Sequence, residues 1–138
     1  MRPLPLFVPL LLTAACVSTN AALLDPTVRL APICPEGVAM FTTADKVGGT
    51  YREIAILNSK GESGWTNEEG MFNSMRKKAA SLGANGIILS NVNEPSAGSK
   101  IAGALFGTGS ERKGSSVAID IPGDSLRVRE ACQATEQE

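Results

Sequence analysis

Residues 77–92 read "KKAASLGANGIILSNV", and this stretch places a helix end, a corner and a strand next to one another. Gly83 follows the last apolar residue of the helical pattern, and glycine suits the left-handed backbone with which many helices end. Asn85 and Gly86 tolerate the turn that leads into residues 87–89, an apolar run typical of an interior strand. We therefore interpret this stretch as part of the fold rather than as a binding site.

The helix that leads into this corner has a predicted start at residues 66–69, "TNEE". Thr66 can cap the helix while Glu69, three residues later, reaches back as in a capping box. An apolar stripe at helical spacing follows, formed by Met71, Met75, Ala79 and Leu82. The sequence thus predicts an amphipathic helix that covers one face of a sheet.

Strand patterns lie on both sides of this helix. Residues 38–42 and 51–58 precede it, and residues 87–89 and 117–121 follow it, with a last short strand over 126–129. We expect an α+β fold, a small β-β-α-β-β domain with one helix packed on a mainly antiparallel four-stranded sheet.

The longest connection, residues 94–116, is rich in glycine and serine. Its composition predicts a loop of low order, yet it contains the apolar run 101–106. Apolar side chains in an exposed loop often meet a partner. Ile101, Leu105 and Phe106 are therefore candidate partner contacts.

The N-terminus has the three parts of a secretory signal. A cationic start with Arg2 precedes an apolar run over 4–12, which is too short to span a bilayer as a helix. The run ends in "LLTAAC", which resembles a bacterial lipobox, although Thr13 stands where leucine is usual. We expect residues 1–15 to be a signal peptide and Cys16 to be lipidated; cleavage after Ala21 or Ala22 is the alternative.

Residues 16–36 contain three prolines and predict a lipid-attached tether, followed by a single domain over 37–133. The residue after Cys16 is Val17 and not aspartate. With valine at this position, the lipobox resemblance implies sorting to the outer membrane. Several acyl chains would anchor the protein firmly to the membrane. The expected location is the periplasmic side of the envelope, attached to the outer membrane.

The charge balance excludes a large class of partners. Loss of Arg2 with the signal leaves 12 basic and 14 acidic residues, a net charge of −2. The one basic cluster, residues 76–78, is short and typical of a solvated helix face. No broad basic field is present, so we expect no nucleic-acid binding.

Two cysteines remain beside Cys16, one near each end of the domain. In an oxidising compartment an isolated pair is interpreted first as a disulfide. We therefore predict a Cys34–Cys132 disulfide. A redox-active pair is less consistent with the sequence, because there is no CxxC spacing and no histidine.

Most enzyme chemistries find no support in the sequence. The chain has no histidine, which excludes Ser-His-Asp and Cys-His catalysis and disfavours a catalytic zinc site. The glycine-rich stretch lacks the Gly-Lys-Ser/Thr order of a P-loop, because Lys113 precedes Gly114. We expect no enzyme activity, no cofactor and no metal.

The run "MRKKAASLGANGIIL" (75–89), the strand "YREIAIL" (51–57) and the candidate lipobox together resemble small bacterial envelope lipoproteins. The pattern is similar to the Rcs stress-sensor outer-membrane lipoprotein family and its uncharacterised relatives. The corner is also similar to a small domain labelled heavy-metal-binding. The likeness spans residues 38–121 and implies a compact β-β-α-β-β module. The chain departs from it in having one possible disulfide, fewer than the Rcs sensor, and no histidine.

Two functions follow as expectations. The first is a non-enzymatic envelope lipoprotein that acts as an interaction or sensing module for a protein or wall partner. The alternative is a small ligand- or metal-binding envelope domain, or an enzyme without histidine. Detection of a bound ligand in native mass spectrometry would favour the second.

Overall fold

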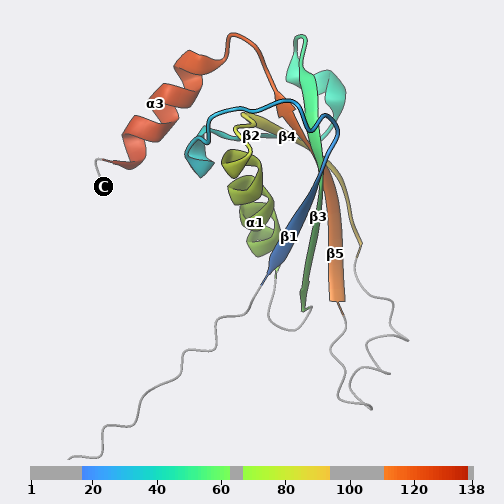
Figure 1. Cartoon of the computed structure of the whole chain (residues 1–138). Coiled ribbons are helices and arrows are strands. Elements are labelled where there is room, and N and C mark those ends of the chain that lie inside the picture. The colour runs from blue at the N-terminus through green and yellow to red at the C-terminus, as the bar shows by residue number, and fades with distance from the viewer. Residues whose placement is uncertain (1–16, 63–66, 94–110, 137–138) are drawn as a thin grey trace, which may run out of the picture.

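A computed structural model describes residues 17–62, 67–93 and 111–136 of the 138-residue chain. The fold is α+β, as the sequence predicts, with a sheet covered on one face by a helix (Figure 1). The strands are β1 (Ser18–Leu23), β2 (Ala39–Phe41), β3 (Arg52–Glu62), β4 (Gly86–Asn93) and β5 (Glu111–Asp120); the α-helices are α1 (Glu68–Ser81) and α3 (Ser125–Thr135), and two short 3-10 helices are η1 (Pro35–Gly37) and η2 (Ala44–Val47).

The sheet has five strands in the order β1-β3-β5-β4-β2. Strand β3 pairs with β1 and β5 in antiparallel orientation, β5 pairs with β4 likewise, and β2 pairs with β4 in parallel. The expected layout of four strands and one helix is therefore too small, and the sheet is mixed. Its two edge strands are β1 and β2.

Strand β1 lies within the segment 16–36 that the sequence predicts to be a tether. All six of its residues pair with β3, from Ser18 opposite Lys60 to Leu23 opposite Ala55. The tether prediction is wrong for this segment, and the folded part of the chain includes residues before 37. The sequence of strand β1, STNAAL, has no charged side chain and no clear alternation of apolar and polar residues. It therefore does not predict a strand by itself.

The chain after the turn at 122–124 is helical, not extended. The sequence pattern Leu-Arg-Val-Arg at 126–129 alternates like a strand, yet these residues form the start of α3. Val128 and Cys132, one helical turn apart, lie against Gly37 of η1. This i, i+4 contact explains the helix, because it places two side chains on one face.

Strand β5 begins at Glu111, so the end of the predicted loop 94–116 belongs to the sheet. The rest of that loop lies outside the described residues. The N-cap of α1 is Asn67, whose side-chain oxygen accepts a hydrogen bond from Gly70 N at 2.8 Å. The predicted Thr66 cap is therefore displaced by one residue, and asparagine is an equally good cap.

The core lies between α1 and the sheet. The apolar stripe of α1 meets side chains from β3, β4 and β5, and removal of this apolar area from water stabilises the fold. The largest fully buried side chains are Leu57, Met71, Met75, Ile87, Ile119 and Ser116.

The corner after α1 confirms the structural interpretation of "LGANG" and the left-handed backbone predicted for Gly83, but it changes the roles of Asn85 and Gly86. Gly83 has a φ of +76°, and an added Cβ would clash with Leu30 Cβ. Gly86 has no unusual φ; an added Cβ there would lie 3.0 Å from Ile119 Cγ1. Asn85 is also without a positive φ, and its side chain makes the contacts described below.

Candidate interaction surface

The predicted disulfide is present. Cys34 and Cys132 are bonded through their sulfurs, 2.01 Å apart, with their Cα atoms 5.7 Å apart. The bond ties the N-cap of η1 to the middle of α3. It therefore holds the last helix against a segment that lies 98 residues earlier in the chain.

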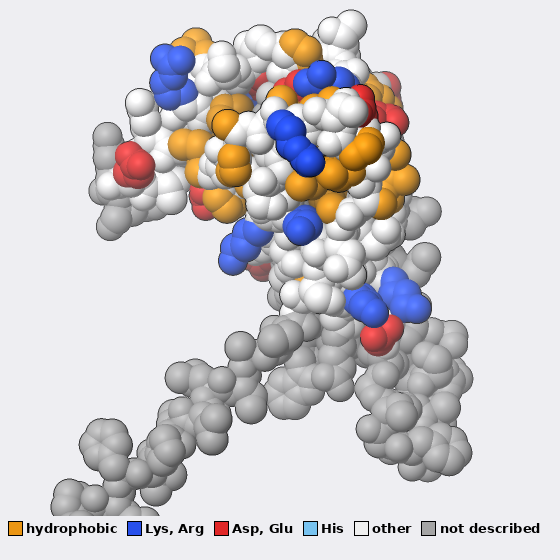
Figure 2. Space-filling model, viewed as in Figure 1, with side chains coloured by type: hydrophobic (Ala, Val, Ile, Leu, Met, Phe, Trp, Pro, Cys, Tyr) orange, Lys and Arg blue, Asp and Glu red, His pale blue; other side chains and the backbone are white. Residues whose placement is uncertain are grey.

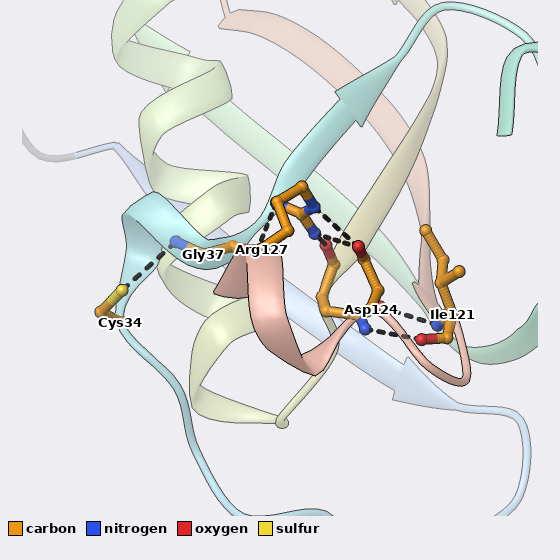
Figure 3. A network of polar contacts seen from close by, with 6 residues as sticks. Cys34, Gly37, Ile121, Asp124 and Arg127 are labelled. Carbon is orange, nitrogen blue, oxygen red and sulfur yellow. Dashed lines mark hydrogen bonds and ion pairs between the residues drawn. The ribbon is translucent and has the colours of Figure 1, made fainter. Parts of the chain in front are cut away.

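An arginine strengthens this attachment (Figure 3). Arg127 of α3 donates to the carbonyl oxygens of Gly37 at 3.2 Å and of Asn85 at 3.0 Å. The same guanidinium pairs with Asp124, with Nε 2.7 Å from the carboxylate. Because several of its N–H groups have acceptors, Arg127 acts as a structural clamp between α3, η1 and the corner after α1.

The corner and the end of β5 are joined through the Asn85 side chain. Its Nδ2 donates to the Ile121 carbonyl at 2.9 Å, and its Oδ1 accepts from Ile121 N–H at 2.7 Å. Asn85 is 8% exposed, and a buried amide needs such partners. The geometry explains an asparagine here by hydrogen bonding, with no ligand required.

A second polar cluster lies where β1 meets α1. The Thr19 hydroxyl donates to Ser59 Oγ of β3 at 3.1 Å and lies 2.6 Å from Ser74 Oγ of α1. These three hydroxyls connect the edge strand to both its neighbouring strand and the covering helix. They fix the N-terminal half of β1, and no pattern in the sequence predicts that they lie together.

The two edges of the sheet differ in how open they are. Strand β2 has three residues and lies between η1 and η2, whereas β1 has six residues and contains neither a charge nor a proline. Edge strands that are short, charged or interrupted by proline resist pairing with other chains. Strand β1 has none of these protections.

Exposed apolar side chains gather at the C-terminal end of β1. Leu23 is 38% exposed, Leu24 46% and Ile56 38%. Ala22 lies directly opposite Ile56 in the sheet register, and Leu24 N–H donates to the Ile54 carbonyl at 2.9 Å. We call Ala22, Leu23, Leu24 and Ile56 the β1 edge surface.

The space-filling view shows hydrophobic side chains exposed over the upper part of the domain, interspersed with lysine and arginine (Figure 2). The one other large apolar residue that is exposed among the described residues is Leu126 of α3, at 62%. It lies on a different element from the β1 edge surface. Ala22 and Ile56 lie opposite each other on one face of the sheet, and exposed apolar side chains beside an edge strand are typical of protein-binding surfaces.

The chain turns sharply after this surface, at Asp25. The Thr27 hydroxyl donates to Asp25 Oδ1 at 2.6 Å, and Thr27 N–H donates to the same oxygen at 2.9 Å. These hydrogen bonds hold the pKa of Asp25 below its ordinary value of 3.8, because they favour the ionised carboxylate. The turn directs the chain away from β1 and ends the open edge.

Within the described residues, no three side chains of Asp, Glu, Cys or His come together as metal ligands would. No helix among those residues is long and apolar enough to cross a membrane. Cys16, the predicted lipidation site, and the predicted partner contacts Ile101, Leu105 and Phe106 lie outside the described residues.

Comparison with known proteins bears on the fold. The chain is similar to a Francisella virulence factor, FvfA, with a TM-score of 0.52 and 16% sequence identity over 74% of this chain and 96% of that chain. At this identity the likeness shows a shared fold. No described protein family and no curated protein matches the sequence.

Proposed function

We propose that this protein is a non-enzymatic cell-envelope lipoprotein that acts as an interaction or sensing module, with the β1 edge surface as a binding site for a partner strand. The observation that carries the proposal is the contrast between the sheet edges. Strand β1 is uncharged, six residues long and ends at two exposed leucines, Leu23 and Leu24, whereas β2 is short and lies between two 3-10 helices.

Strand addition is the binding mode that fits this edge. A partner segment in extended conformation would pair with the backbone N–H and C=O groups on the side of β1 that faces no other strand among the described residues. Its side chains would cover Leu24 and Ile56, which removes exposed apolar area from water. Hydrogen bonds would provide affinity, and the apolar contacts would provide selectivity for an uncharged partner segment.

The position of β1 also relates this surface to the proposed lipid anchor. Strand β1 begins at Ser18, two residues after Cys16. Lipid attached to Cys16 would therefore leave almost no tether, and the sheet edge would lie close to the membrane surface. This arrangement favours a partner that is itself in or near the outer membrane.

The predicted contacts Ile101, Leu105 and Phe106 remain part of the proposal as a second point of contact. The resemblance of the sequence to the Rcs stress-sensor lipoprotein family supports a sensing role. The alternative is a ligand- or metal-binding envelope domain or a histidine-free enzyme. A bound small molecule in native mass spectrometry of the purified protein would support that alternative.

Site-specific photo-crosslinking in the native envelope tests the binding surface. A photoreactive amino acid at Leu24 is expected to capture a partner protein, and the same group at Asn73 on α1 is the control. Both residues are exposed, but Asn73 lies on the helix rather than on the sheet edge. Equal capture at the two positions, or none at Leu24, would contradict the proposal.

A charge variant gives an independent test. Ala22→Lys should reduce capture at Leu24, because a lysine on an edge strand opposes strand pairing. Asn73→Lys adds the same charge away from the edge and should leave capture unchanged. Intact-mass analysis reports separately on the anchor: an unmodified N-terminus at Ala22 or Leu23 would refute lipidation at Cys16 and leave the edge proposal standing.

A further inference from the structure

Met40, the central residue of β2, lies against an arginine of α1. Arg76 donates from Nη2 to Met40 Sδ at 2.9 Å. The Nε of Arg76 is buried and has no hydrogen-bond partner among the described residues. The guanidinium of Arg76 has five N–H donors, and its hydrogen-bond acceptor among the described residues is a thioether, which is a weak acceptor.

The methionines differ sharply in access to solvent. Met71 and Met75 are 0% exposed on the buried side of α1, whereas Met40 is partly exposed on an edge strand. Thioether oxidation requires contact with the oxidant, so susceptibility follows exposure. Of the methionines in the described residues, Met40 is the one that is not fully buried.

We propose that Met40 is a modification site, oxidised by hydroperoxides to methionine sulfoxide, and that Arg76 is the positioning residue that accommodates the oxidised form. The inference is independent of the lipid anchor and of the β1 edge surface. It concerns the opposite edge of the sheet.

The reaction balances with hydrogen peroxide as the oxidant. A lone pair of Met40 Sδ attacks one peroxide oxygen, the S–O bond forms and the O–O bond breaks. The sulfur loses two electrons and the peroxide gains them. The departing hydroxide and the proton released from the transferred oxygen form one water, so each peroxide yields one sulfoxide and one water.

Arg76 changes the consequence of this oxidation. A sulfoxide is normally disruptive, because it converts an apolar side chain into a polar one. Here the new oxygen would lie beside a cation whose buried Nε has no partner among the described residues, and hydrogen bonds from a charged donor are among the strongest in proteins. Oxidised Met40 should therefore be retained within the fold, where methionine sulfoxide reductases could later reverse it.

Peroxide titration of the purified protein, with its Cys34–Cys132 disulfide intact, tests the site. Peptide mass mapping should find the mass of one added oxygen on Met40 at least about tenfold faster than on Met71 or Met75, because buried sulfurs react only through rare openings. Comparable rates at the three methionines, or slower reaction at Met40, would overturn the proposal.

The role of Arg76 is tested by the melting temperature before and after oxidation. In the unsubstituted protein the shift should be smaller than about 2 °C, whereas in Arg76→Leu oxidation should lower it by about 4–8 °C. Arg76→Lys keeps a charged donor and should recover part of the difference. Lys77→Leu removes a neighbouring exposed cation and should behave as the unsubstituted protein. Equal shifts in the unsubstituted protein and Arg76→Leu would refute the positioning role.

A further pair of variants keeps the test decisive if Arg76→Leu does not fold. Met40→Gln places an amide oxygen near Arg76, while Met40→Leu offers no acceptor. The proposal predicts that Met40→Gln melts at a temperature equal to or above that of Met40→Leu. A clearly lower melting temperature for Met40→Gln would contradict it.

Discussion

Asn85 and Ile121 are joined by two hydrogen bonds between one side chain and one backbone, of 2.9 and 2.7 Å. One amide therefore satisfies both backbone groups of the residue at which the chain leaves β5. Asn85 N–H and C=O also bond to Ile119 and Ala39. A single buried residue thus connects β2, the corner after α1 and the end of β5.

Asn85→Ala should lower the free energy of unfolding by about 2–3 kcal/mol, because it removes two hydrogen bonds and leaves the Ile121 N–H unpaired, whereas the Ile121 carbonyl still accepts from Asp124 N–H. Chemical denaturation would measure the loss. Asn73→Ala, at an exposed position of α1, is the control and should change stability by less than about 0.5 kcal/mol. Similar losses in both variants would show that the Ile121 contacts contribute little.

Alanine substitutions at Gly83 and Gly48 allow the cost of a left-handed backbone to be measured separately from the cost of a steric clash. Gly83 and Gly48 have φ values of +76° and +73°, but an added Cβ meets Ala31 O at 2.6 Å at Gly83 and nothing within 4 Å at Gly48. Gly48→Ala should cost about 1–2 kcal/mol for the left-handed backbone alone. Gly83→Ala should cost about 3 kcal/mol or more, since an overpacking penalty is added. Equal costs would exclude the clash.

Removal of the disulfide should destabilise the domain strongly. The bond closes a loop of 98 residues, and chain entropy assigns about 4.7 kcal/mol to a loop of this size. The Cys34→Ala, Cys132→Ala double variant should have a lower melting temperature and should lose protection of α3 from hydrogen exchange first. Protection of α3 equal to that of α1 would show that Arg127 holds the helix without the disulfide.

Acid should weaken the turn after β1. The Thr27 hydrogen bonds lower the pKa of Asp25 in the folded protein, so their stabilising effect is complete above the ordinary pKa of 3.8 and is lost as pH falls through the folded value. NMR titration of the Asp25 carboxyl should report this depressed pKa. Thr27→Val removes the hydroxyl donor and should raise the pKa towards 3.8; an unchanged pKa would assign the effect to the backbone N–H alone.

The sequence predicted the α+β class, the helix, four of the strands and the disulfide, because these rest on local periodicity and cysteine position. The helix stripe through Met71 and Met75 and the apolar run at Ile87 confirm that these signals were strong. The class of the fold therefore follows from patterns within short windows.

What the sequence missed depends on contacts between distant residues. Strand β1 has no amphipathic pattern of its own and is held by β3 and by the Thr19 hydroxyl cluster. Helix α3 is determined by η1, through Val128 and the disulfide, against a local pattern that alternates like a strand. The β1 edge surface was also not predicted, because its exposure depends on β1 being an edge strand in the order of the sheet.

The strand order β1-β3-β5-β4-β2 has a kinetic consequence. Of the strands that follow one another in the sequence, β4 and β5 are the one pair that lie side by side in the described sheet. The other pairings join distant segments; Arg52 of β3, for example, contacts Asp120 of β5, 68 residues later. Such a high contact order slows folding, because long loops must close before pairing begins. A chain that emerges N-terminus first holds β1 without a partner until β3 is made, and β3 is not enclosed until β5 follows. The interval before closure is thus when the uncharged first strand is most exposed to aggregation.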